Sequence, residues 1–459
     1  MQRTDARSRA AAVLERVERG AFCDALVGET LARADMDPRE AALFVRLAYG
    51  TIAWQRRLDW TLESLSRRPL DRLDPAVRAA LRLGLFQLTR LDRVPAHAAV
   101  DASVEIAKAG AGAGGASFAN AVLRAAARDG ERAMPPESEG LGRALSIRWS
   151  HPEWLVERWL DELGRERAER LLEADGEDAP TVLRVDLRRR TRGQVIDELA
   201  EAGVGARPTA HARAGVVLSG PARAGLALAH ARPQGEASQL VADLVGASAG
   251  ERIADLCAAP GGKSGALAEA LEIAGPGGLV VAADRTRAGM RRVAALARGG
   301  PDGSGGRRIA AILADVLAPP FPDGAFAGVL LDAPCSGLGT LRAHPEIRWR
   351  RTSDDVARLA AVQRAMIARA ARLVRPGGRL VYATCTLLRA ENEDVVESLL
   401  AARPDFVRDD ARAWLPAEAH DLVGPDGALR TSPDRGGLDG FFAVRLRRVD
   451  DVAPGRGAP

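Results

Sequence analysis

The segment RIADLCAAPGGKS at residues 252–264 decides the fold class of this chain. Its first five residues form a short apolar run that predicts a buried strand, and helical spacing of apolar residues begins at Gly262. Between the two lie Cys257 and the glycine pair Gly261 and Gly262, where backbone can approach a ligand and a helix N-terminus offers free N–H groups. The segment therefore predicts a strand, a ligand-binding turn and a helix, as in a parallel α/β sheet.

The alternation of strands and helices continues from this segment toward the C-terminus. Further strands are predicted at residues 279–283, 309–313, 328–331 and 379–383, with helices at 262–273, 287–298 and 354–374. This alternation favours a doubly wound, mostly parallel sheet, to which residues 441–446 add a last strand that we expect to be antiparallel. We assign this α/β domain to residues 236–450 and a flexible tail to residues 451–459.

Further parts precede the α/β domain. Residues 1–130 predict an all-helical domain, because apolar residues recur at helical spacing in segments 10–17, 41–52, 77–88, 100–107 and 117–128. Residues 131–148, with Pro135 and Pro136 beside acidic residues, have the composition of a linker. Residues 149–235 predict a small α/β subdomain, with helices at 152–174 and 192–202 and strands at 181–187 and 215–218.

Composition limits the classes of function. Apolar residues make up 47% of the chain and charged residues 27%, which is ordinary for a soluble globular protein and excludes general disorder. No apolar run approaches the ~18 residues that cross a membrane, and residues 1–20 lack the apolar core of a secretory signal, so we predict a cytoplasmic protein with no membrane partner. The 4 cysteines show no metal-ligand spacing, so we expect neither a metal site nor disulfides.

Positive charge is concentrated in two regions of a chain whose net charge is only +4. Residues 1–128 hold 20 Lys and Arg against 15 Asp and Glu, whereas the rest of the chain holds 45 against 46, and ten arginines lie in residues 340–380. These regions favour a polyanionic partner, although solvated helix faces explain the charge equally well. Lys108 and Lys263 are the only lysines among 63 arginines, which favours a need for a compact ammonium there.

One aspartate follows each of three successive predicted strands, namely Asp284, Asp315 and Asp332. A single such residue is more often a helix cap or turn residue, but an ordered series favours a nucleoside-containing cofactor at the carboxyl edge of the sheet. The tripeptide GKS at 262–264 imitates a phosphate-binding loop, but Cys257 stands where that motif needs glycine. We therefore exclude a nucleoside triphosphatase.

Two cysteines also follow predicted strands. Cys335 comes after the strand at 328–331, and Cys385 comes after the strand at 379–383. A lone cysteine is usually a small buried apolar residue. Two at the rim of one cleft instead indicate a reactive site, where a thiolate can attack an electrophilic carbon.

These motifs make the chain resemble a known enzyme family. Residues 255–264, 332–339 and 384–385 are similar to the RNA cytosine-5 methyltransferases that use S-adenosylmethionine, and LRAHPEIRWR at 341–350 resembles the RsmB (Sun/Fmu) type, which modifies bacterial small-subunit (16S) ribosomal RNA. Four N-terminal segments resemble a NusB-like domain, namely LAYG at 47–50, LRLGLFQL at 81–88, VPAHAAV at 94–100 and NAVLR at 120–124. The resemblance, which covers nearly the whole chain, implies a Rossmann-like class I methyltransferase domain behind a NusB-like RNA-binding domain and an RNA-recognition-like subdomain.

The resemblance also implies the cofactor and the site residues. Cys385 is the implied nucleophile, Cys335 assists release of the methylated product, and Asp332 also stands near the cytosine ring. Carbon 5 of cytosine becomes nucleophilic only after a thiolate has added at carbon 6, and a paired base must first be exposed or flipped. The cofactor is S-adenosylmethionine, with implied contacts at Cys257, Ala258, Ala259, Pro260, Gly261, Gly262, Lys263, Asp284, Asp315 and Asp332.

Other functions stay open on the sequence alone. The same reaction on transfer RNA fits the arginine-rich region equally well, and only the NusB-like domain favours ribosomal RNA, either naked or in a partly assembled small subunit. A non-catalytic NusB-like RNA-binding factor is disfavoured by the intact acids and cysteines. The chain departs from the family pattern at Gly235, Ser264, Leu338 and Thr386, of which Ser264 and Thr386 preserve a hydroxyl. We expect a monomer.

Overall fold

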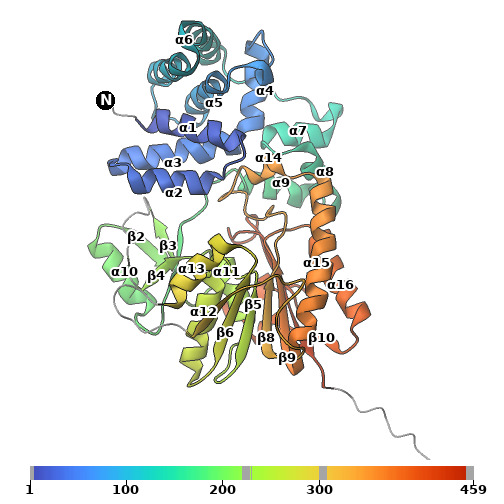
Figure 1. The fold of residues 1–459 in the computed structure, drawn as a ribbon. Helices are drawn as coiled ribbons and strands as arrows, with labels where there is room; N and C mark the ends of the chain where they lie inside the picture. The colour runs from blue at the N-terminus through green and yellow to red at the C-terminus, as the bar shows by residue number, and fades with distance from the viewer. Residues whose placement is uncertain (1–4, 220–227, 229, 299–307, 451–459) are drawn as a thin grey trace, which may run out of the picture. The chain divides into compact units, whose positions relative to one another are not determined.

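The computed structural model describes residues 5–219, 228, 230–298 and 308–450 (Figure 1). The chain forms two compact units, a helical unit of residues 1–179 with 340–352 and an α/β unit of residues 180–339 and 353–459. The division after residue 179 falls inside the predicted 149–235 subdomain, because the helices at its start pack with the helical unit and its strands with the α/β unit. The predicted tail at 451–459 lies outside the described residues.

The helical unit confirms the predicted all-helical N-terminal region. Its helices are α1 Ala6–Glu18, α2 Cys23–Arg33, α3 Pro38–Ala53, α4 Gln55–Leu65, α5 Pro75–Arg90, α6 Ala96–Asp129, α7 Leu141–Arg148, α8 Glu153–Leu163, α9 Arg165–Ala174 and α14 Ile347–Arg350, with short turns η1 Leu70–Arg72 and η2 Glu137–Glu139. Asp37 and Asp74 cap α3 and α5 by accepting hydrogen bonds from backbone N–H groups, and proline follows each cap. The predicted helices at 100–107 and 117–128 join in α6 across a kink at Ala111 and Gly112.

Apolar side chains from α3 and α5 form the centre of this unit. Phe44, Leu47 and Phe86 are fully buried. A Cβ atom on Gly50 would lie 2.2 Å from the Phe86 ring, so the close packing of α3 on α5 requires glycine at this position.

Two sequence predictions in this unit are corrected. Residues 141–148 of the predicted linker form α7, in which Leu145 and Ile147 are buried and which packs against α8. The predicted helix at 152–174 is broken at Gly164, whose φ of 74° is left-handed and ends α8. A helix of 8 residues is too short to show periodicity beside a proline-rich stretch, which is why composition was misleading.

Part of the predicted arginine-rich region belongs to the helical unit and is structural. Arg348 in α14 is 1% exposed. Its guanidinium donates hydrogen bonds to the carbonyl oxygens of Ala53, Ser150, Asp175 and Leu341 at 3.0–3.4 Å. The interpretation of 340–380 as one basic surface is therefore wrong for Arg348, and exposed arginines of this region lie at Arg358, Arg364, Arg369, Arg372 and Arg375.

The α/β unit confirms the predicted mostly parallel sheet. Its strands are β5 Arg252–Leu256, β6 Leu279–Asp284, β7 Ile309–Leu313, β8 Phe326–Asp332, β9 Val374–Thr384, β10 Phe406–Asp409, β11 Leu429–Thr431 and β12 Phe441–Arg448. The order is β10-β12-β9-β8-β5-β6-β7, with β11 also paired to β12. Strands β9 to β7 are parallel, and β12 is antiparallel to β9 as expected. The short strands β10 and β11 were not predicted.

Helices cover both faces of this sheet (Figure 1). They are α11 Glu236–Asp243, α12 Gly262–Ala274, α13 Arg287–Ala297, α15 Ser353–Leu373 and α16 Glu393–Ala402, with turns η4 Arg389–Glu391, η5 Ala411–Ala413 and η6 Ala417–Leu422. Neighbouring residues of β6 enter opposite cores, since Val280 packs with α12 and α13 whereas Val281 packs with α15. The chain leaves β5 toward β6 and returns at β8 on the other side of β5, which is a switch point where ligands bind in such sheets.

The smaller sheet of the α/β unit has the order β2-β3-β1-β4 and is antiparallel throughout. Its strands are β1 Val182–Val185, β2 Gly205–Pro208, β3 Gly215–Ser219 and β4 Ala231–Pro233, and α10 Arg192–Glu201 packs on it. Thr191 and Gln194 start α10 with a reciprocal capping box. The strands β2 and β4 were not predicted.

Candidate active site

The loop after β5 folds across the end of β6. The backbone N–H groups of Cys257 and Ala258 both donate to the Ala283 carbonyl oxygen at 2.9 Å. Gly261 has a φ of 109°, a left-handed conformation that suits glycine, and α12 begins at the next residue. The predicted glycine pair thus turns the chain and leaves the first N–H groups of α12 for a ligand.

Asp255 lies beneath this loop and is 1% exposed. Its Oδ2 accepts a hydrogen bond from Ser264 Oγ at 2.5 Å, whereas its buried Oδ1 makes no hydrogen bond within the described residues. Burial raises the pKa of Asp255 to about 6, although the bond from Ser264 lowers it. A buried acceptor without a donor is uncommon in folded proteins, which makes Asp255 a candidate contact for a polar ligand.

The three predicted aspartates have different surroundings. Asp284 Oδ2 accepts from the backbone N–H of Ala259 at 3.2 Å, and its Oδ1 accepts from the backbone N–H and hydroxyl of Thr286. Asp315 is exposed and accepts from the Leu317 N–H at 2.9 Å, which is the turn role that such residues often have. Asp284 thus contacts the loop after β5 directly, and Asp332 contacts it through Lys263. Asp315 does not bond to the loop in this way, but the preceding residue, Ala314, donates its N–H to the Asp284 carbonyl oxygen.

Lys263 forms a half-buried ion pair with Asp332. Its Nζ lies 2.7 Å from Asp332 Oδ2 and 5.2 Å from the centre of the Phe441 ring. Burial alone lowers the pKa of Lys263, but the negative charge of Asp332 and its hydrogen bond with the ammonium outweigh burial, so the net pKa is raised. The compact ammonium that the sequence singled out is therefore held charged at the carboxyl edge of the sheet.

Cys335 and Cys385 meet at the ends of the adjacent strands β8 and β9. Their Sγ atoms lie 3.3 Å apart, and the Cys385 N–H donates to Cys335 Sγ at 3.3 Å. The hydrogen bond with Cys385, burial and nearby negative charge raise the pKa of Cys335, so this thiol stays protonated. Cys257 lies in the loop after β5. Burial raises the pKa of its thiol, and its backbone N–H holds the loop by donating to the Ala283 carbonyl oxygen.

Two buried carboxylates at this edge were missed as individual site residues. Asp255, which is 1% exposed, lies inside the predicted strand at 252–256, and Glu391, which is 0% exposed, lies in none of the predicted motifs. Glu391 contacts Ser336, which is 55 positions earlier in the chain, and neighbouring residues carry no motif that reveals such a contact. The signal in the sequence for Asp255 is an acid inside a short strand, where its neighbours Ala254 and Leu256 are apolar.

Neither metal binding nor membrane insertion has a visible basis in the described part of the chain. No group of three His, Cys, Asp or Glu side chains there is arranged to hold a metal ion. Within the same residues, the helices are all too short or too polar to span a bilayer.

Family models match three parts of the chain. The model for the 16S rRNA methyltransferases RsmB/F matches residues 243–447, the NusB family model matches residues 4–128, and a ferredoxin-like domain model of RsmF/B-like methyltransferases matches residues 151–224. The fold is also that of the solved structure of PH0851, with a TM-score of 0.81 and 24% identity over 96% of this chain and 98% of that one.

Relatives match over almost their full length. The probable ribosomal RNA small subunit methyltransferase B of Bacillus subtilis is 32% identical, over 98% of this chain and 100% of the relative. The ribosomal RNA small subunit methyltransferase B of Thermus thermophilus is 36% identical, over 97% and 98% respectively. On this similarity, the chain belongs to the RsmB/F family of S-adenosylmethionine-dependent ribosomal RNA small-subunit methyltransferases.

Proposed function

We propose that this protein transfers a methyl group from S-adenosylmethionine to carbon 5 of a cytosine in 16S ribosomal RNA, with Cys385 as the covalent nucleophile. The observation that carries the proposal is the pair of thiols 3.3 Å apart at the ends of β8 and β9. A protonated thiol beside a second cysteine supports two separate roles, one as nucleophile and one in product release. The Lys263–Asp332 pair lies at the same edge.

The residues of the loop fit S-adenosylmethionine. The N-terminus of α12 suits the carboxylate of the cofactor, the orphaned Asp255 oxygen suits a donor group, and Asp284 suits the ribose hydroxyls. Proposed contacts are Cys257, Ala258, Ala259, Pro260, Gly261, Gly262, Lys263, Asp284, Asp315 and Asp332. When bound, the cofactor supplies an electrophilic sulfonium methyl group.

The steps at the base follow from the cysteines. The Cys385 thiolate adds to carbon 6 of a flipped cytosine, which makes carbon 5 enamine-like and able to accept the methyl group. The Lys263 ammonium stabilises the thiolate electrostatically, and the Asp332 carboxylate stabilises the N3 edge of the base in its protonated form by accepting a hydrogen bond from it. A base then removes the carbon 5 proton, the electrons of that C–H bond restore the double bond between carbons 5 and 6, and the bond from carbon 6 to sulfur breaks to release the Cys385 thiolate, a release that Cys335 assists.

The remaining parts of the chain have supporting roles in this proposal. The region matched by the NusB model and the small sheet matched by the ferredoxin-like model hold ribosomal RNA, and residues 236–450 carry out the chemistry. The protein acts as a cytoplasmic monomer on naked RNA or on a partly assembled small subunit.

Bisulfite sequencing of a strain that lacks the gene tests the proposed function. We expect one cytosine of 16S ribosomal RNA to lose its protection from deamination, because methylation at carbon 5 slows that reaction. Protection returns when the wild-type gene is restored and stays absent with Cys385→Ala. Unchanged 16S ribosomal RNA together with a lost methyl group in transfer RNA would assign the reaction to transfer RNA instead, and no change in either RNA would favour a non-catalytic factor.

Asp284→Ala is expected to weaken S-adenosylmethionine binding by about 1–3 kcal/mol, or about 5- to 150-fold in Kd. The ribose hydroxyls lose a charged acceptor, and the Ala259 N–H of the loop loses its partner. Calorimetry with the wild-type protein and the variant measures the difference. Asp323→Ala is the control, since Asp323 is an exposed acid paired with Arg372. Equal affinity of wild type and Asp284→Ala would remove Asp284 from the cofactor site.

A further inference from the structure

A buried polar network lies directly behind the two cysteine loops. Glu391 Oε1 accepts from the Ser336 N–H at 2.8 Å and from Gln363 Nε2 at 2.9 Å, and Glu391 Oε2 accepts from the Ser336 hydroxyl at 2.5 Å. The Ser336 hydroxyl also lies 3.0 Å from Thr386 Oγ1. Ser336 follows Cys335 in the chain and Thr386 follows Cys385, so this one carboxylate connects the residues next to both thiols.

We propose that Glu391 is a positioning residue that sets the position of the Cys335 thiol relative to the Cys385 thiol. Its effect on catalysis rests on the proposed cysteine chemistry, whereas its effect on the distance between the thiols does not. Glu391 contacts Ser336 directly, reaches Thr386 through the Ser336 hydroxyl, and reaches the Pro334 carbonyl oxygen through Gln363.

The charge of Glu391 calls for an explanation beyond packing. The carboxylate is 0% exposed and forms no ion pair among the described residues. A buried charge without an opposite partner is costly, and a neutral side chain would fold at lower cost. The carboxylate accepts from the Ser336 N–H and the Gln363 amide with one oxygen and from the Ser336 hydroxyl with the other, whereas glutamine would replace one of these oxygens by an NH2 donor and force the Ser336 hydroxyl to accept.

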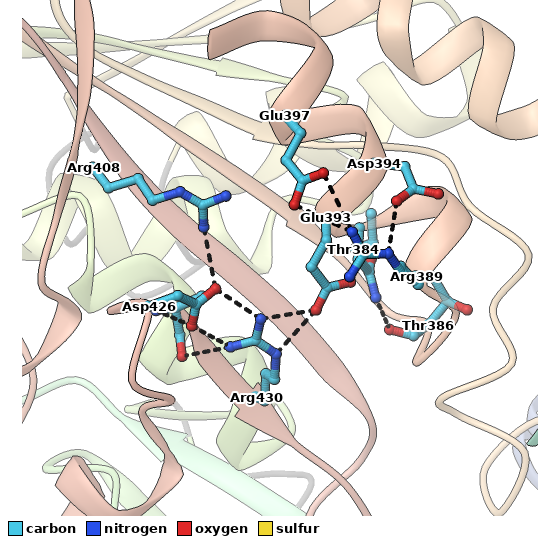
Figure 2. A network of polar contacts seen from close by, with 11 residues as sticks. Thr384, Thr386, Arg389, Glu393, Asp394, Glu397, Arg408, Asp426 and Arg430 are labelled. Carbon is cyan, nitrogen blue, oxygen red and sulfur yellow. Dashed lines mark hydrogen bonds and ion pairs between the residues drawn. The ribbon is translucent and has the colours of Figure 1, made fainter. Parts of the chain in front are cut away.

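The turn that carries Glu391 is itself anchored on all sides. Its carbonyl oxygen accepts from the Tyr382 hydroxyl at 2.6 Å. Asn392 accepts from the Thr384 hydroxyl and donates to the Thr386 carbonyl oxygen at 3.0 Å. Figure 2 shows the third anchor, in which Glu393 at the start of α16 pairs with Arg430 at 2.8 Å.

These anchors hold the Glu391 carboxylate in place and, through it, the loop that contains Ser336. The same negative charge helps to raise the pKa of Cys335, which keeps that thiol protonated beside the nucleophile. Glu391 therefore acts on Cys335 both in its position and in its protonation.

The test compares Glu391→Gln with Glu397→Gln in the full-length protein. Glu397 undergoes the same chemical change in α16 but is 54% exposed and pairs with Arg389. Thr386→Val is a second variant, which removes the hydroxyl link to Ser336 and leaves the contacts of Glu391 in place. Thermal melting and the Kd for S-adenosylmethionine are measured for every variant to separate folding from positioning.

Three readouts follow the cysteines. Phenylarsine oxide needs two adjacent thiols, so wild type and Glu397→Gln should bind it tightly and Glu391→Gln weakly. Alkylation of Cys335 by iodoacetamide, followed by peptide mass spectrometry, should move to lower pH in Glu391→Gln because a nearby negative charge is gone. The kcat for RNA methylation should fall about 10- to 100-fold with the KM for RNA unchanged, as expected for misplaced reacting groups.

The outcomes separate this proposal from the proposed function. Wild-type arsenical binding, alkylation and kcat in Glu391→Gln would overturn the positioning role, even if the wild type forms its RNA adduct. Loss of arsenical binding in the variant, with no adduct in the wild type, would uphold the positioning role and overturn the covalent mechanism. If Glu391→Gln does not fold, Thr386→Val decides by the same arsenical and kcat measurements, and unchanged values there overturn the proposal.

Discussion

Replacing Cys385 with alanine is expected to reduce methyl transfer to RNA by more than about 1,000-fold and to prevent any covalent protein–RNA adduct. Without the thiolate, nothing adds to carbon 6, and carbon 5 stays part of an aromatic ring. Methyl transfer is measured as labelled methyl groups incorporated into ribosomal RNA. The control is Cys23→Ala, which changes a fully buried cysteine of the helical unit and should leave activity unchanged.

Cys335→Ala is expected to fail at a later step. Attack by Cys385 and methyl transfer remain possible, but release slows because the thiol 3.3 Å away is missing. The variant should accumulate as an RNA-linked species whose mobility in a denaturing gel drops and is restored by ribonuclease. An adduct with Cys385→Ala and none with Cys335→Ala would exchange the two roles. Full activity in both variants would make both cysteines ordinary packing residues.

The local parts of the fold and site were predictable because their signals are contiguous in the chain. The strand β5 and the start of α12 lie at the residues that periodicity predicts. Of the predicted glycine pair, Gly261 lies in the turn between them and Gly262 is the first residue of α12. Cys335, Cys385 and Asp332 could also be brought together from sequence, since parallel strands end at one edge of a sheet.

Contacts between distant segments could not be predicted in this way. Ser336 and Glu391 are 55 positions apart, and neither has a neighbour pattern that marks it as buried. The short strands β10 and β11 exist because they pair with β12, with little periodicity of their own. The number of arginines in residues 340–380 likewise does not show which of them are buried, as Arg348 is.

The position of Arg348 has a clear physical reason. Helix C-termini leave carbonyl groups unpaired and carry partial negative charge. Ala53 is the last residue of α3, Ser150 follows the end of α7, and Asp175 follows the end of α9, so three helix ends direct carbonyl groups at one guanidinium. In the same segment, Trp349 Nε1 donates to the Ile52 carbonyl oxygen at 2.8 Å. The segment 340–352 thereby closes the helical unit as a shared cap, although it lies between two strands of the α/β unit in sequence.

Arg348→Met is accordingly expected to lower the free energy of unfolding of the helical unit by about 2–4 kcal/mol, or its Tm by about 5–15 °C. Methionine fills a similar volume but leaves the carbonyl groups buried and unpaired. Arg348→Lys should also destabilise, because one ammonium cannot span four acceptors. Calorimetric melting measures both, with Arg33→Met as control, since Arg33 is 78% exposed on α2. By the same argument, a fragment of residues 1–179 without 340–352 should unfold at lower temperature than the helical unit in the full chain. A wild-type Tm for Arg348→Met, combined with weaker RNA binding, would return this arginine to the RNA-binding surface that its charge first suggested.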